Sequence, residues 1–299
     1  MTNYARSPIV VVPVGDLHVG SSVALCPPGG VQLEDGGHYL PNDAQKWLHA
    51  RWVDMLARVR DLRKRRYHVV VVSLGEFIDG RHHETTQLLS QTPEIQASAA
   101  LDLMQPLAAL AHELYVLRGT EAHSGKGAAS DMAIGRELGA RRDPSTGMHA
   151  FYHLLLDVAG VHLDVAHHIG GGGDDARIYG NAIRRETAAM LMERPDTHIV
   201  LRGHVHRFAD TGLAFPTAWG AVVPAWQLKT AFTHRVTRRE YFSVGTWLVH
   251  IENKQWETER LMWSVQTPPR IVSQLSTSLV SSKSQSSTRS RKDDQTNSP

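Results

Sequence analysis

The chain has 299 residues, of which 41% are hydrophobic and 21% charged, a composition typical of a globular protein with a sizeable core. Its formal net charge of +2 is too small to indicate nucleic acid or anionic lipid as a partner. The single cysteine, Cys26, excludes an internal disulfide. No stretch approaches the roughly 18 apolar residues of a membrane span, so we expect a cytoplasmic protein that does not enter a membrane.

Apolar runs of strand length alternate with helical patterns along most of the chain. Asn42 is a suitable cap for a helix that continues to about Arg66. A second helix is expected over 93–113, where Pro106 should cause a kink or a break. Strands are predicted over 8–16, 68–76, 114–120, 153–168 (two strands turned at Ala159 and Gly160) and 198–204. Further helices are expected over 130–138 and, after a glycine-rich loop over 170–176, up to about Arg194.

The C-terminal third differs in character from the rest. Short β-segments are expected from Thr211 to Val265, including one over 239–252, and they would complete an α/β core. From about Gln274 onward the residues are mainly Ser, Lys, Arg, Thr and Gln, a composition that cannot bury enough apolar surface to fold. We therefore expect one domain over 1–273 and a disordered tail over 274–299.

Residues of the types that bind metals follow the predicted strands. His204 and His206 flank a single valine, and in an extended segment residues two apart point the same way. Asp16 and His18 have the same spacing. Because ligands bind at the carboxyl ends of strands in open α/β sheets, these clusters are expected to converge on one crevice. The other clusters are Glu76 with Asp79, Glu121 with His123, and His167 with His168.

Taken alone, each cluster has an ordinary structural explanation, such as a turn cap or a surface imidazole. Their repetition after successive strands favours metal binding instead. Mixed imidazole and carboxylate ligands suit Mn, Fe, Ni or Zn better than Ca or Mg. The number of ligands exceeds what one ion needs, which favours two ions about 3.5–4 Å apart with a bridging carboxylate.

The order of these clusters resembles the signature of the calcineurin-like metallophosphoesterases: Asp-x-His, Gly-Asp-x-x-Asp, Gly-Asn-His-Asp/Glu, a lone His, then Gly-His-x-His. The resemblance covers roughly residues 9–207, and the variants "GTEAH" and "GE-x-IDG" are similar to those of phage-type members. It implies an α/β (α+β) fold, a β-sandwich flanked by helices in four αββα layers, with two metals at one edge.

The resemblance also implies residue roles. The candidate catalytic residues are Asp16, acting as a ligand, and His123, which would protonate the leaving oxygen. Sequence leaves open whether His167 or His168 points inward. The first metal would be bound by Asp16, His18 and His206, the bridge would be Glu76, and the second metal would be bound by His167 and His204.

This chain departs from the signature at two places. Glu76 stands where the family has an aspartate, and "GTEAHSG" stands where the family has Gly-Asn-His. Thr120 falls at the asparagine position, but Glu121 is the better metal ligand by chemistry. Both are therefore candidate ligands, and His123 lies two positions later than the signature places its histidine.

The remaining assignments are supporting ones. Asp79 is expected to orient a metal-binding side chain without binding the metal itself. Arg81, His82 and His168 are candidates for contact with substrate. The implied protein is a hydrolase with two divalent ions, Mn²⁺ first and Fe, Zn or Ni as alternatives. Its substrate would be a phosphate monoester or diester, including DNA for a nuclease, or a nucleotide. The alternative is a non-catalytic metal-binding scaffold of the same fold that binds other proteins.

Overall fold

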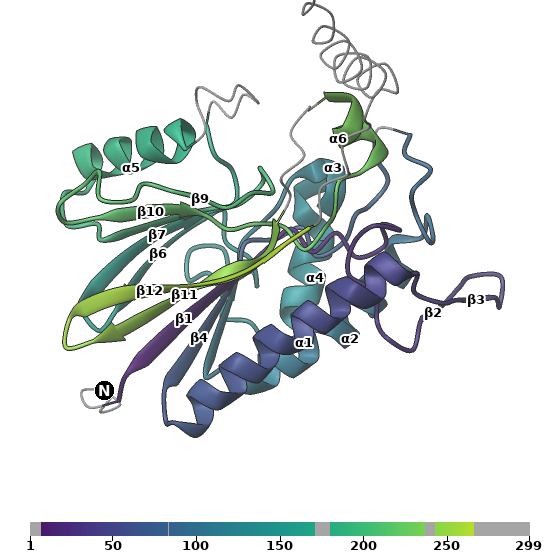
Figure 1. Ribbon diagram of the computed structural model, residues 1–299, viewed down its shortest axis with the longest axis horizontal. Coiled ribbons are helices and arrows are strands. Elements are labelled where there is room, and N and C mark those ends of the chain that lie inside the picture. The colour runs from purple at the N-terminus through teal and green to yellow at the C-terminus, as the bar shows by residue number, and fades with distance from the viewer. Residues whose placement is uncertain (1–6, 83, 171–179, 237–242, 266–299) are drawn as a thin grey trace, which may run out of the picture. The chain divides into compact units, whose positions relative to one another are not determined.

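A computed structural model describes residues 7–82, 84–170, 180–236 and 243–265, and its main elements are two five-stranded sheets with helices outside them (Figure 1). The tail expected over 274–299 lies outside the described residues. Among the helices that the structure describes, none is both long and apolar enough to cross a membrane.

The first sheet has the strand order β12-β11-β1-β4-β5. Its centre is parallel: β1 (Ile9–Val14) pairs with β4 (His68–Ser73), and β4 pairs with β5 (Glu113–Val116). On the other side, β11 (Ser243–Glu252) runs antiparallel to β1 and forms a hairpin with β12 (Gln255–Ser264). Every residue of β1 and β4 is buried, which explains their continuous apolar sequences.

The second sheet has the order β6-β7-β8-β10-β9. The hairpin of β6 (His153–Val158) and β7 (Val161–Ala166) turns at the expected glycine, Gly160. Next to it, β8 (Ile199–Arg202) is parallel to both β7 and β10 (Trp219–Val222), and β9 (Ala209–Asp210) closes the edge. A separate two-stranded ribbon joins β2 (Val31–Gln32) and β3 (His38–Tyr39).

Helices cover the outer face of each sheet. On the first sheet lie α1 (Asp43–Lys64), α2 (Pro93–Leu110) and α4 (Ala129–Glu137), and on the second lies α5 (Asn181–Glu193) (Figure 1). Shorter helical segments are α3 (Glu121–Ser124), η1 (Lys126–Ala128) and α6 (Ala231–Val236). The cap predicted for the first helix is confirmed, because Asn42 and Gln45 form a reciprocal capping box.

The hydrophobic core forms three clusters: one between the first sheet and its helices, one between the two sheets, and one between the second sheet and α5. Along β1, Val10, Val12 and Val14 pack under the helices, whereas Val11 packs between the two sheets, as the alternation of a strand requires. A smaller cluster around Ile183 joins α5 to the second sheet. The layer order is therefore helix, sheet, sheet, helix, and the expected mixed α+β sandwich is confirmed.

Three details differ from expectation. Pro106 lies inside α2 without dividing it, because buried neighbours such as Leu103 and Leu107 hold the helix against the core. β12 is longer than the short segments expected, since it has 10 residues, whereas β11 lies within the β-segment expected over 239–252. A helix, α6, lies in a region where only strands were expected.

Candidate metal centre

The residues of the candidate centre follow strands of both sheets. Asp16 and His18 come after β1, and Glu76 and Asp79 after β4. His167, His204 and His206 come after β7 and β8 of the second sheet. The sequence pattern predicted that these clusters converge on one crevice, and the structure shows that they come from the ends of strands in two packed sheets.

The loops that carry these residues have an unusual backbone. The φ angles of Asp16, His18 and Glu76 are 51°, 48° and 55°, and those of His204 and His206 are 70° and 49°. A non-glycine residue in the left-handed region costs on the order of 1–3 kcal/mol, and such residues cluster at functional sites. The loops hold one another in place, because the amides of Asp16 and His18 donate to the carbonyls of Gly75 and Glu76 at 3.1 Å each.

His18 is completely buried, and both of its ring nitrogens have defined neighbours. Its Nδ1 lies 3.0 Å from the Oδ1 of Asp79, which as a carboxylate accepts the hydrogen bond. In the neutral imidazole this leaves Nε2 unprotonated. That Nε2 lies 3.2 Å from the Oε2 of Glu76 and 3.0 Å from the Nε2 of His206. Three electron-rich atoms therefore face one another, an arrangement that requires a proton or a cation between them.

His167 repeats this arrangement on the other side of Glu76. Its Nδ1 donates to the carbonyl of Leu74 at 2.7 Å, so this nitrogen carries the proton. Its Nε2 lies 3.2 Å from the Oε1 of Glu76. Each oxygen of Glu76 thus faces the inner nitrogen of a different buried histidine. Thr120 completes the surroundings of Glu76 by donating its amide and its hydroxyl to Oε1.

The electrostatics of these groups favour positive charge between them. Burial lowers the pKa of His18 and of His167, but their bonds to Asp79 and Glu76 outweigh it and raise these pKa values to about 10 and about 9. Burial raises the pKa of Glu76, but the two histidines hold it well below its ordinary value. Burial raises the pKa of Asp16 to about 7. His18 and His167 therefore each carry a proton on both ring nitrogens at neutral pH when no cation is bound.

The potential ligands form three groups, and within each group the ligand atoms lie within 4.8 Å of one another. Within these groups, two buried atoms lack a hydrogen-bond partner among the described residues: the Oδ1 of Asp16 and the Nε2 of His167. In the neutral ring of His167 both atoms are unpaired buried acceptors, which a cation would satisfy, so the residues fit a metal. The groups are Asp16, His18, Glu76 and His206; His167, His168 and His204; and His18, Asp79 and His123.

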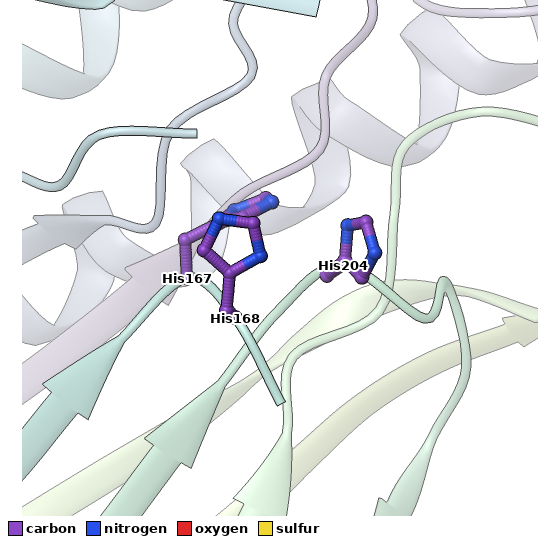
Figure 2. A group of neighbouring side chains, drawn as sticks. All are labelled: His167, His168 and His204. Carbon is purple, nitrogen blue, oxygen red and sulfur yellow. The ribbon is translucent and has the colours of Figure 1, made fainter. Parts of the chain in front are cut away.

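The second group is drawn in Figure 2, where His167 and His168 follow one strand and His204 follows its neighbour. The ring of His167 lies 5.1 Å from that of His168 and 5.3 Å from that of His204. His167 is buried, whereas His168 and His204 are exposed. Both histidines that the sequence left open thus reach the group, but only His167 faces Glu76.

His123 and the substrate candidates lie beside the first group. The Nδ1 of His123 donates to the carbonyl of Asp79 at 2.7 Å, and its ring centroid is 4.4 Å from that of His18 and 4.1 Å from that of His82. Burial, followed by the charge of His18, lowers the pKa of His123 to about 4. His82 is partly buried, with its Nε2 3.4 Å from the Oδ2 of Asp79, whereas Arg81 is exposed.

One predicted ligand is not brought to the centre. Glu121 is exposed, and its carboxylate accepts a hydrogen bond from the amide of Gly127 at 2.9 Å instead. Two buried residues were missed by sequence reasoning. Gln227 donates to the Oδ1 of Asp79 at 3.1 Å, and Asp131 lies behind the Glu76 loop. Neither follows a ligand-rich strand end, so the sequence carries no signal for them.

Comparisons with known proteins give only structural likenesses. No protein-family model matches the sequence, and no curated protein is similar to it. Among solved structures, Vps29 from Entamoeba histolytica, solved with Zn²⁺, aligns with 86% of this chain and 99% of its own at 12% identity, with a TM-score of 0.39. A hypothetical protein from Pyrococcus horikoshii aligns with 92% of this chain and 94% of its own at 7% identity and TM-score 0.41. A predicted phosphoesterase from Streptococcus pneumoniae covers 87% and 91% at 10% identity and TM-score 0.34.

Proposed function

We propose that the chain is a binuclear metal-dependent phosphoesterase of the calcineurin-like metallophosphoesterase superfamily. One observation carries the proposal: the two oxygens of Glu76 lie 3.2 Å from the Nε2 atoms of His18 and His167, whose other nitrogens are engaged elsewhere. A carboxylate between two such histidines is the arrangement of a bridging ligand in a two-metal site.

The first ion would be held by Asp16, His18, Glu76 and His206. The second would be held by His167, His204 and the second oxygen of Glu76, with His168 beside them. Oxygen and imidazole ligands together suit Mn²⁺, with Fe, Zn or Ni as alternatives. The outer nitrogens of His18 and His167 bind a carboxylate and a carbonyl, which is how proteins commonly fix the orientation of metal-binding histidines.

When bound, two ions activate a water as a nucleophile near neutral pH and offset the charge of phosphate oxygens. His123 would then donate a proton to the leaving oxygen. Because the Nδ1 of His123 is held by the carbonyl of Asp79, its Nε2 is the atom that can carry the transferred proton. An anionic phosphate next to the ring would raise the pKa of His123 from its low value and favour that protonated form.

The substrate follows from the same chemistry: a phosphate ester, either a monoester or a diester, including DNA or a nucleotide. The first test is hydrolysis of bis-p-nitrophenyl phosphate and p-nitrophenyl phosphate by metal-stripped protein to which Mn²⁺ is added back, together with a count of bound ions. Two ions per chain with turnover are expected, and the preferred ester separates diesterase from monoesterase.

The bridging role of Glu76 has a matched control in the same region. Glu76→Ala should lose both ions together, because each oxygen serves one of them. Glu121→Ala, which removes an exposed carboxylate, should keep both ions and wild-type turnover. If the wild-type protein holds one ion or none and cleaves neither ester, the hydrolase proposal is wrong and the non-catalytic scaffold takes its place.

A further inference from the structure

Asp131, in the first turn of α4, is a completely buried carboxylate outside the three metal-binding groups. Its Oδ2 accepts hydrogen bonds from the amide of Gly119 at 2.8 Å, from the hydroxyl of Ser124 at 2.7 Å and from the amide of Glu76 at 3.3 Å. Its Oδ1 accepts from the amide of Phe77 at 3.3 Å. All four bonds reach loops at the candidate centre.

The four donors belong to two different loops. Glu76 and Phe77 follow β4, whereas Gly119 and Ser124 lie in the segment after β5. These loops are in direct contact: a Cβ atom on Gly119 would lie 2.3 Å from the Cγ of Glu76. Asp131 therefore holds the Glu76 loop against the segment after β5. Glu76 faces His18 and His167, and Thr120 of that segment donates to Glu76.

We propose that Asp131 is a positioning residue of the metal centre, whose carboxylate fixes the backbone at Glu76 and Gly119 so that the Glu76 side chain lies between His18 and His167. This inference rests on the proposed function. The donor set supports it, because a buried carboxylate is costly unless it is well hydrogen-bonded, and here three of the four bonds come from backbone next to the bridging residue.

The test is Asp131→Asn, which preserves size but leaves one acceptor oxygen, so that at least one donor then faces an NH₂ group. We expect the Mn²⁺ dissociation constant to rise about 10–100-fold, the usual effect of losing a group that orients a ligand. In the metal-free protein, the amides of Gly119 and Glu76 should exchange hydrogen faster than in the wild type. Titration with Mn²⁺ alone and amide exchange followed by NMR supply both measurements.

Two further variants make the result decisive. Leu107→Ala leaves a cavity near the C-terminal end of α2. It should lower the urea midpoint of unfolding without changing the Mn²⁺ dissociation constant. Ser124→Ala removes one of the four donors and should raise that constant about two- to fivefold, which decides the matter if Asp131→Asn does not fold. An unchanged dissociation constant in the folded Asp131→Asn protein would overturn the inference, as would an equal loss of affinity in Leu107→Ala.

The proposed function can fail separately. A wild-type protein that binds Mn²⁺ but cleaves no phosphate ester would refute the hydrolase, whereas the affinities and exchange rates of the variants would still decide the role of Asp131.

Discussion

His18 and Asp79 are joined by a hydrogen bond of 3.0 Å between Nδ1 and Oδ1, across 61 residues of sequence, with both side chains buried. In the neutral ring, the bond fixes which nitrogen of His18 carries the proton, and it directs Nε2 towards Glu76 and His206. Gln227 donates to the same oxygen of Asp79, so the carboxylate is itself held in place. The orientation of His18 thus depends on a residue that belongs to another loop.

Asp79→Asn is expected to weaken Mn²⁺ binding by about 10–100-fold, because the amide keeps the size of the side chain but removes the charge that makes His18 a stronger ligand. Titration with Mn²⁺ measures the change. The matched control is Asp43→Asn, whose side chain is fully exposed on α1 and should leave the affinity unchanged. Equal affinities for wild-type and Asp79→Asn proteins would contradict the orienting role.

His123→Ala is expected to retain both ions and to lose turnover by about 10²–10⁴-fold on esters with poor leaving groups, where proton donation matters most. The loss should be much smaller for p-nitrophenyl esters, because p-nitrophenolate leaves readily without a proton. Comparing phenyl phosphate with p-nitrophenyl phosphate measures the difference. His162→Ala, in the second sheet, serves as the control. Equal losses on both esters would argue against His123 as the acid.

Metal binding is expected to release protons and to strengthen as pH rises from 6 to 8. In the metal-free protein the pKa values of His18 and His167 are raised to about 10 and about 9, so both rings are protonated at neutral pH and each must lose a proton to bind an ion. Calorimetric titration with Mn²⁺ in two buffers of different ionisation heat should detect about two protons from these rings. An affinity independent of pH over this range would contradict the assignment.

The same shifts predict how the stability of the metal-free protein depends on pH. Because the folded-state pKa values of His18 and His167 lie above the ordinary value of 6.5, their contribution is fully present below about pH 6.5 and is lost as pH rises through about 9 and 10. Urea unfolding at pH 6 and pH 10 measures this loss, and protein loaded with Mn²⁺ should lose less. Equal unfolding free energies at both pH values would contradict the prediction.

Gly75→Ala is expected to destabilise the protein more than Gly36→Ala. Both glycines have left-handed φ angles, 89° and 84°, so both substitutions introduce strain of about 1–2 kcal/mol. A Cβ on Gly75 would lie 2.5 Å from the amide nitrogen of Gly119, whereas one on Gly36 meets nothing within 4 Å. Urea unfolding of both variants isolates the cost of this contact, and equal losses would show that the two loops separate freely.

Much of the fold could be predicted from sequence because its signals are local. The apolar runs of β1 and β4 and the cap at Asn42 are read directly from neighbouring residues. Pro106 does not break α2, because the packing of the helix against the core overrides the local preference of proline. The length of β12 was not predicted, because its exposed residues alternate with partly buried ones and interrupt any apolar run, whereas β11 lies within the β-segment expected over 239–252.

The candidate centre shows the same division. Residue types and spacing after the strands identified Asp16, His18, Glu76, His204 and His206, which the structure brings together, although metal binding itself stays a prediction. Only the tertiary structure distinguished His167, which faces Glu76, from His168, and Thr120, which donates to Glu76, from Glu121, which turns towards Gly127.

Sequence determined which residues stand at the ends of the strands, because hydrophobic periodicity is a property of neighbouring residues. It could not determine where their side chains point, since that depends on left-handed backbone angles and on contacts with loops far away in the chain. Asp131 and Gln227 illustrate the limit: each acts through partners in other loops, and such contacts exist only after the two sheets and their helices have packed.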